Sequence, residues 1–257
     1  MDDLAGSTPS TPPPARHPLS TNSAIAKADG GIPNTPLAVA TIAFVLGTVF
    51  CFGLSVVCYG QLMGYWWSTY QLGFFVAAWA AFHWGEFAVT AGWNLEKCSV
   101  DSFLLNNGAT YHIANGTALV EYVITLYFAP TWKSHHVLSY IGISTVIIGQ
   151  TLRSTAMVHA STNFSHAVAY RKRPSHRLVT EGIYQYFRHP SYAGFFYWAL
   201  GTQLVLQNPV SFVLFSVLLW RFFYYRTRAE EKYLIQFFGQ EYVAYRGRVG
   251  TKIPFIP

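Results

Sequence analysis

The sequence predicts an all-α protein that crosses a membrane with about six helices and ends in a cytosolic amphipathic helix. Only 11% of its 257 residues are charged and 52% are hydrophobic, whereas soluble domains carry about 25% charged residues. Apolar runs long enough to cross a bilayer, which takes about 20 residues, recur along the chain. The net charge of +6 is concentrated in a few polar segments. This pattern indicates contact with anionic lipid headgroups and not with nucleic acid.

The chain divides into a polar N-terminal segment and a long apolar region. Residues 1–34 are rich in Ser, Thr, Pro and Ala, which predicts a disordered cytosolic tail. Residues 35–257 are expected to form one transmembrane domain. Its first four spans are expected at residues 36–59, 69–92, 111–129 and 137–158.

Two further spans are expected within residues 191–226, which are interrupted by Gln207, Asn208 and Pro209. Asn and Pro favour a turn, so this region is expected to form a helical hairpin. Beyond it, residues 227–246 alternate apolar and charged positions at helical spacing. This alternation predicts the C-terminal amphipathic helix.

The distribution of Lys and Arg predicts the orientation of the chain. With six spans, both termini lie on the same side of the membrane. The segments 60–68, 130–136 and 207–209 would lie on the other side, and of the 17 Lys and Arg residues they hold only Lys133. Because cytosolic segments carry the excess of basic residues, both termini are expected in the cytosol.

Ionisable residues inside the predicted spans include His83, Glu86, Glu121 and Arg153. Such residues are costly in a bilayer and are candidates for function. For the first three, pairing between helices is the preferred interpretation. The common nucleotide, zinc-protease and nucleophile-elbow motifs are absent from the sequence, and its histidines and cysteines lack metal-ligand spacing, so no metal site is expected.

The segment from Leu178 to Gly194 is a candidate binding element. Pro190 suits the first turn of a helix, which would place His189 and Ser191 at a helix N-terminus. Exposed N–H groups and the helix dipole favour an anion there. By itself this pattern fits a helix cap as well as a ligand site.

Several motifs identify a family resemblance. They are Ser102–Gly108 (SFLLNNG), Arg153–Met157 (RSTAM), Asn163–His166 (NFSH), Arg188–Gly194 (RHPSYAG), Trp220–Phe223 (WRFF) and Glu230–Gly239 (EEKYLIQFFG). Over about residues 80–256 the chain resembles the isoprenylcysteine carboxyl methyltransferases, and among them the shorter, six-span fungal branch. The RHPxYxG and Glu-Glu motifs also occur in phospholipid methyltransferases and sterol reductases, whereas the upstream motifs are specific.

The resemblance implies an enzyme of the endoplasmic reticulum membrane. It would methylate the C-terminal carboxylate of farnesyl- or geranylgeranylcysteine on processed CaaX proteins, with S-adenosylmethionine as methyl donor. Its partners would be prenylated proteins and membrane lipid. Carried over by motif, Arg153 and Arg226 would be catalytic, and Arg226 would also bind the substrate. The cofactor site, mainly in residues 159–257, would include His176, Arg177, Leu178, Val179, Tyr184, His189, Tyr192 and Glu230.

The chemistry of the acceptor agrees with these residue types. A carboxylate with a pKa of about 3.5 is already ionised at neutral pH, so no general base is needed. Arginine holds a carboxylate with its planar fork and stays charged in a low-dielectric site. The alternative enzyme, a phospholipid N-methyltransferase, would have to deprotonate an amine. A transporter or membrane scaffold would place charges on both sides of the membrane, and this sequence has few on one side.

Overall fold

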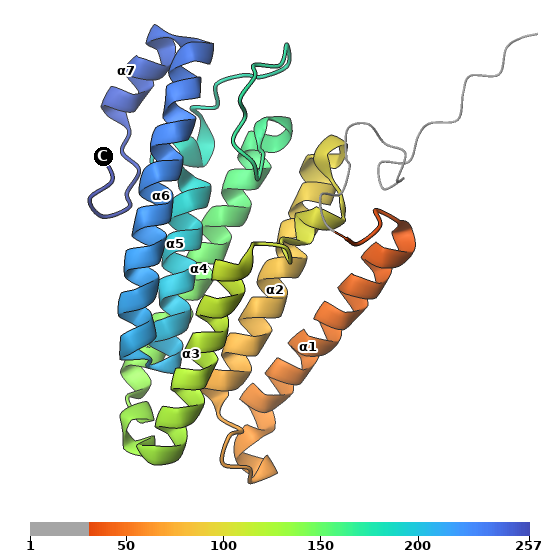
Figure 1. Cartoon of the computed structure of the whole chain (residues 1–257), viewed down its shortest axis with the longest axis vertical. Helices are drawn as coiled ribbons and strands as arrows, with labels where there is room; N and C mark the ends of the chain where they lie inside the picture. The colour runs from red at the N-terminus through yellow and green to blue at the C-terminus, as the bar shows by residue number, and fades with distance from the viewer. Residues whose placement is uncertain (1–30) are drawn as a thin grey trace, which may run out of the picture.

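The computed structural model describes residues 31–257, and within this range the protein is all-helical (Figure 1). The only β pairing among the described residues is an isolated bridge between Ile253 and Ile256. The seven α-helices are α1 (Pro36–Met63), α2 (Tyr70–Trp93), α3 (Ala109–Phe128), α4 (His136–Ala160), α5 (Pro190–Leu206), α6 (Pro209–Phe238) and α7 (Gln240–Arg248). Short 3-10 helices, η1 (Leu95–Lys97), η2 (Val100–Phe103), η3 (Pro130–Lys133), η4 (Ser161–Asn163) and η5 (Gly182–Gln185), lie in the connections.

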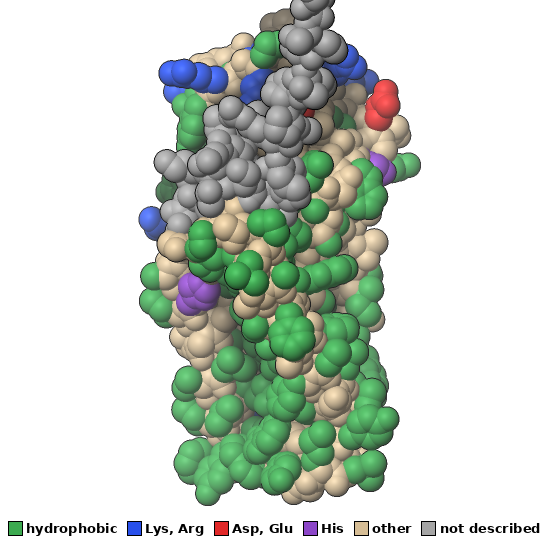
Figure 2. All heavy atoms as spheres, turned by 90° about the vertical axis from the view of Figure 1, so that its right-hand side faces the viewer, with side chains coloured by type: hydrophobic (Ala, Val, Ile, Leu, Met, Phe, Trp, Pro, Cys, Tyr) green, Lys and Arg blue, Asp and Glu red, His purple; other side chains and the backbone are tan. Residues whose placement is uncertain are grey.

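The first six helices run up and down along one axis and form an elongated bundle (Figure 1). Each predicted span corresponds to one of these helices. By length and hydropathy, α1 and α2 qualify as membrane spans, and the count of six spans stays a prediction. On the face drawn in Figure 2, the charged side chains gather at the upper end and most of the surface below is hydrophobic.

The tail predicted over residues 1–34 falls mostly outside the described range. At its end, the buried side chain of Asn34 accepts a hydrogen bond from the backbone of Val100 (2.9 Å). The packed part of the chain therefore begins at or before Asn34, one residue earlier than the expected domain start.

The amphipathic helix expected over residues 227–246 is not a separate element. Its first part continues α6 to Phe238, because residues 210–238 contain no Gly or Pro that would end the helix. The break comes at Gly239, whose φ of 56° is a left-handed value that glycine adopts at little cost. The last part then forms α7, packed beside the end of α6.

Helices α4 and α5 pack with their backbones in close contact. Each contributes two glycines seven residues apart, Gly142 and Gly149 facing Gly201 and Gly194. A Cβ at Gly149 would lie 2.6 Å from the backbone nitrogen of Trp198, and one at Gly194 would lie 2.7 Å from that of Arg153. Small residues at helix interfaces permit such close approach, which here brings Arg153 beside the start of α5.

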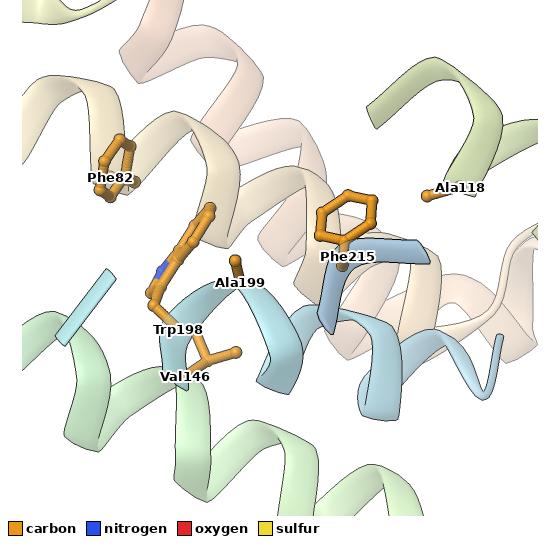
Figure 3. Close-up of a cluster of buried hydrophobic side chains, with 6 residues drawn as sticks. All are labelled: Phe82, Ala118, Val146, Trp198, Ala199 and Phe215. Carbon is orange, nitrogen blue, oxygen red and sulfur yellow. The ribbon is translucent and has the colours of Figure 1, made fainter. Parts of the chain in front are cut away.

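The core of the bundle forms where these helices meet α2, α3 and α6. Phe82, Ala118, Val146, Trp198, Ala199 and Phe215 make up one buried cluster (Figure 3). The ring centroids of Phe82 and Trp198 lie 4.6 Å apart, so aromatic packing joins α2 to α5.

At the end of the bundle that holds the turns between α3 and α4 and between α5 and α6, two ionisable residues satisfy helix termini. The Lys133 ammonium donates to the carbonyls of Leu206 (2.9 Å) and Gln207 (2.9 Å) at the end of α5. The Glu121 carboxylate accepts from the backbone N–H groups of Val210 (2.9 Å) and Ser211 (2.6 Å) at the start of α6. The charges complement both helix ends, so Lys133 and Glu121 have structural partners.

Candidate active site

A polar cavity with a volume of about 110 Å³ lies at the upper end of the bundle. All eight residues expected to hold the cofactor line it: His176, Arg177, Leu178, Val179, Tyr184, His189, Tyr192 and Glu230. The end of α6 and helix α7 complete the wall with side chains such as Leu234, Phe238, Tyr242 and Tyr245. Segments far apart in sequence are thus brought together around one space.

An apolar cavity of about 400 Å³ lies next to it, between α3, α4, α5 and α6. Aromatic and aliphatic side chains dominate its wall, including Trp198, Phe215 and Leu218. Both expected catalytic arginines, Arg153 and Arg226, line this cavity and not the polar one. The residues common to both cavities are Phe164, Ser165, Ser191 and Tyr192.

The boundary between the cavities is built on the first turn of α5. His189 precedes Pro190, which starts the helix, and its imidazole stacks on the Tyr192 ring with centroids 5.2 Å apart. The Tyr192 hydroxyl donates to Glu230 (2.5 Å) and accepts from Arg226 Nε (2.9 Å). Tyr192 therefore connects a carboxylate of the polar cavity with an arginine of the apolar cavity.

Arg153 is held by two protein partners, Glu86 and Ser191. Its Nε and Nη2 donate to the two oxygens of Glu86 (2.5 Å and 2.8 Å), and its Nη1 donates to Ser191 Oγ (3.0 Å). His166 Nε2 donates to the same carboxylate (2.9 Å). Glu86 and His166 were not among the expected site residues. Glu86 was visible in the sequence only as an intramembrane charge, and His166 only as part of the NFSH motif.

A second buried ion pair, between Arg188 and Glu231, lies at the wall of the polar cavity. Arg188 Nε donates to Glu231 Oε1 (2.6 Å), and His189 Nε2 donates to the same oxygen (3.2 Å). Burial would raise the pKa of the Glu231 carboxyl, but the hydrogen bonds and charges of His189 and Arg188 outweigh burial and lower the pKa. Arg188 also donates to the carbonyls of Arg246 and Val249, which ties the C-terminal segment to α5.

The connection between α4 and α5 supplies the remaining wall of the polar cavity. The His176 ring lies against Phe237 and Phe238 at the end of α6. Burial, together with the nearby charges of Lys97, Arg173 and Lys172, lowers the pKa of His176, so its imidazole is neutral at neutral pH. Burial also raises the pKa of Tyr184, whose hydroxyl donates to the Ala156 carbonyl (3.3 Å).

The polar cavity suits a ligand that is part aromatic and part ionic, such as S-adenosylmethionine. Its lining combines the apolar side chains of Leu178, Val179 and Phe238 with the His189 imidazole and the Glu230 carboxylate. The Tyr242 hydroxyl is buried beside the Glu231 carboxylate, and no other group among residues 31–257 is in position to hydrogen-bond with it. A buried hydroxyl without a well-formed hydrogen bond is uncommon and costs free energy, and a polar ligand atom in this cavity would satisfy it.

Comparison with known proteins gives consistent matches. The profile of the "Isoprenylcysteine carboxyl methyltransferase (ICMT) family" matches residues 141–236. The human protein-S-isoprenylcysteine O-methyltransferase is 44% identical, over 74% of this chain and 66% of its own length, which is just under two thirds. The Saccharomyces cerevisiae protein of the same name is 45% identical over 71% of this chain and 79% of its own.

Two further matches cover more of the chain. The Schizosaccharomyces pombe protein-S-isoprenylcysteine O-methyltransferase is 43% identical over 87% of this chain and 98% of its own. The solved structure of a eukaryotic intramembrane Ras methyltransferase, an isoprenylcysteine carboxyl methyltransferase without a monobody, has a TM-score of 0.80 and 40% identity. The match covers 85% of this chain and 77% of the chain in that structure.

Proposed function

The chain belongs to the isoprenylcysteine carboxyl methyltransferase family, and from this premise we propose that it methylates the C-terminal carboxylate of prenylated cysteine. The methyl donor is S-adenosylmethionine and the product is a methyl ester. The observation that carries this proposal is the meeting of a polar and an apolar cavity at Ser191 and Tyr192. The alternative, a phospholipid N-methyltransferase, finds no support, because the matched relatives are carboxyl O-methyltransferases.

The polar cavity supplies the residues that would hold the cofactor. Leu178, Val179 and Tyr184 offer an apolar surface, while His189, Tyr192 and Glu230 offer hydrogen-bonding and charged groups. His176 and Arg177 complete this set. When bound, S-adenosylmethionine supplies an electrophilic methyl group attached to a sulfonium sulfur.

Arg226 is the residue best suited to receive the substrate carboxylate. Its guanidinium lies in the apolar cavity, where its Nε donates to Tyr192 and its Nη2 donates to the His166 carbonyl. Within residues 31–257 no carboxylate forms an ion pair with it. A cation in a desolvated site orients an anionic nucleophile, and alignment of this kind lowers the barrier by several kcal/mol, up to about 11.

The apolar cavity would take the prenyl chain. Each buried CH₂ contributes about 0.8 kcal/mol, and the cavity wall offers Trp198, Phe215 and Leu219 to such a chain. The substrates are thus prenylated CaaX-type proteins, whose lipid tail lies in the membrane while the protein part stays in water. A membrane-embedded enzyme with a cofactor site at one end accommodates both.

The proposal also includes the cellular location and the orientation of the protein in the membrane. The enzyme resides in the endoplasmic reticulum membrane with both termini and the polar cavity on the cytosolic side. Six of the helices cross the bilayer. The gathering of Lys and Arg at the cavity end of the bundle supports this orientation (Figure 2).

The test is methyl transfer from labelled S-adenosylmethionine to N-acetyl-S-farnesylcysteine by the purified protein in lipid. Base-labile methyl ester is expected, and Arg226→Ala is expected to lower kcat/KM about 100-fold, because truncating one partner of a desolvated charge pair costs 2–5 kcal/mol. Arg221→Ala is the matched control, since Arg221 is exposed on the same helix and lines neither cavity.

Absence of ester from a folded preparation that binds S-adenosylhomocysteine would refute the proposal. An equal loss of activity in the Arg226 and Arg221 variants would leave Arg226 without a specific role in substrate binding.

A further inference from the structure

Glu86 is a buried carboxylate that none of the proposed contacts with cofactor or substrate uses. It lies in the middle of α2 and is 1% exposed. Both of its oxygens accept from Arg153, and one also accepts from His166. Glu86 lines neither cavity. It therefore sits behind Arg153 and cannot touch a ligand in the apolar cavity.

The two arginines of the apolar cavity differ in charge balance. All three guanidinium nitrogens of Arg153 donate to protein acceptors, and its charge is matched by Glu86. Arg226 donates to two neutral oxygens, the Tyr192 hydroxyl and the His166 carbonyl. The cavity thus offers one matched and one unmatched guanidinium to an incoming ligand.

His166 links these two arginines. Its side chain donates to Glu86, and its backbone carbonyl accepts from Arg226. A shift of Glu86 would therefore act on both arginines, on Arg153 directly and on Arg226 through the backbone of His166. The arrangement is continuous from α2 through α4 and the following connection to α6.

We propose that Glu86 is a positioning residue that neutralises Arg153, so that the apolar cavity presents a single unmatched positive charge to a monoanionic substrate. The inference rests on the proposed function, because it concerns the charge of a carboxylate acceptor. Between two unmatched guanidinium groups the carboxylate would be bound more tightly in the ground state. Binding that is equally strong before and during the reaction does not raise kcat.

The first measurement compares a farnesyl thioether acid with its primary amide as ligands of wild type and Glu86→Gln. Removing the negative charge leaves Arg153 unmatched, so the acid is expected to bind about tenfold more tightly, a Coulomb effect of a charge within the same desolvated site. The neutral amide is expected to bind within twofold of wild type. In the transfer assay, kcat per cofactor-binding site falls about tenfold and the KM for N-acetyl-S-farnesylcysteine falls with it.

A second variant controls for misfolding of Glu86→Gln, because a buried arginine without its carboxylate partner is strongly destabilising. The double variant Glu86→Gln with Arg153→Gln removes both charges and leaves the net charge of the cavity unchanged. Acid binding by the double variant is expected to return to within about twofold of wild type. Folding of each protein is scored by its capacity for S-adenosylhomocysteine.

The outcomes separate the two proposals. Unchanged acid binding in Glu86→Gln, or equal changes for acid and amide, would overturn the role of Glu86 while leaving the methyltransferase activity intact. Loss of acid binding in the double variant would also overturn it, since Arg153 itself would then hold the carboxylate. Failure of the wild-type protein to form ester is a failure of the proposed function, which is read in a different assay.

Discussion

Tyr242 and Tyr245 lie one turn apart on α7 and both line the polar cavity, but their hydroxyls differ in hydrogen bonding. The Tyr245 hydroxyl donates to the Tyr184 carbonyl (2.7 Å). Among residues 31–257, the Tyr242 hydroxyl faces only the Glu231 carboxylate, whose oxygens also contact Arg188, His189 and Arg246. Substitution of these two tyrosines therefore distinguishes a hydroxyl that binds the cofactor from one that stabilises the fold.

Tyr242→Phe is expected to weaken S-adenosylhomocysteine binding about fivefold, the effect of one hydrogen bond of about 1 kcal/mol. Its thermal stability without ligand is expected to stay equal or to rise, because the variant removes an unpaired buried hydroxyl. Isothermal titration and thermal unfolding in detergent measure the two effects.

Tyr245→Phe is the control and is expected to show the opposite stability change. It leaves the Tyr184 carbonyl without its donor, which costs about 1–3 kcal/mol. Unchanged cofactor affinity in a folded Tyr242→Phe protein would contradict the role assigned to this hydroxyl.

At the scale of the elements, the contact between α4 and α5 positions the chemistry. Gly194 packs against the backbone of Arg153, and it lies one turn after Ser191, which accepts from the Arg153 side chain. Any separation of the two helices would move Arg153 away from the start of α5. The glycines are therefore part of the support of the site, although none of them faces a ligand.

Gly149→Ala is expected to destabilise the protein by about 1–3 kcal/mol, as overpacking does, because the added Cβ would lie 2.6 Å from the backbone nitrogen of Trp198. Thermal unfolding in detergent measures this loss, and methyl transfer at a temperature where the protein is folded measures the displacement of Arg153. We expect kcat to fall while the KM for S-adenosylmethionine is retained.

Gly116→Ala serves as the comparison. Gly116 is also in a long helix, α3, but a Cβ there would meet nothing within 4 Å. Alanine in a helix is favoured over glycine by about 0.5–1 kcal/mol, so this variant is expected to be neutral or slightly stabilising. Equal destabilisation by both substitutions would show that close packing is not the cause.

At the scale of the whole molecule, six helices of alternating direction place helix α7 and the connection between α4 and α5 at one end of the bundle (Figure 1). The residues that line the polar cavity come mainly from these segments and from the adjoining helix ends. The opposite end holds the turns between α1 and α2, α3 and α4, and α5 and α6. The proposed orientation assigns the cavity end to the cytosol, where S-adenosylmethionine and the substrate proteins are found.

Cysteine labelling in sealed microsomes tests this orientation. In a background with Cys51, Cys58 and Cys98 replaced by Ser, a cysteine at Ser175 is expected to react with a membrane-impermeant maleimide added outside. A cysteine at Ser134 is expected to react only after permeabilisation. Both serines are exposed, the first at the cavity end and the second in the turn before α4. The reverse labelling pattern would contradict the assigned topology.

The long helices were predictable because each is a long apolar segment bounded by turn-forming residues. Pro190, Gln207 and Pro209 mark ends of α5 and α6 in the sequence as they do in the structure. The boundary at residue 227 was wrong because a change from apolar to amphipathic composition does not by itself end a helix. Gly239 ends it, and a glycine in a polar segment is a weak signal.

The residues assigned to the cofactor by resemblance line one cavity, which the motifs could suggest but linear spacing could not. The contacts around Arg153 were not predictable from local sequence, because they join residues far apart in the chain. Glu86 lies 67 residues from Arg153, and His166 lies 80 residues from Glu86. The hydrogen bonding of the Tyr242 hydroxyl depends on which groups contact the Glu231 carboxylate in the folded protein, and the local sequence does not predict those contacts.

The sequence by itself determined the membrane class, the helical segments and the family, because hydrophobicity, turn residues and motifs are local properties of the chain. Only the tertiary structure decided which charges are matched. Within residues 31–257, burial and the approach of α2, α4 and α6 to one another leave Arg226 without a carboxylate partner and pair Arg153 with Glu86. In a low-dielectric site the free energy of a charge depends on its nearest neighbours, and the fold alone selects those neighbours.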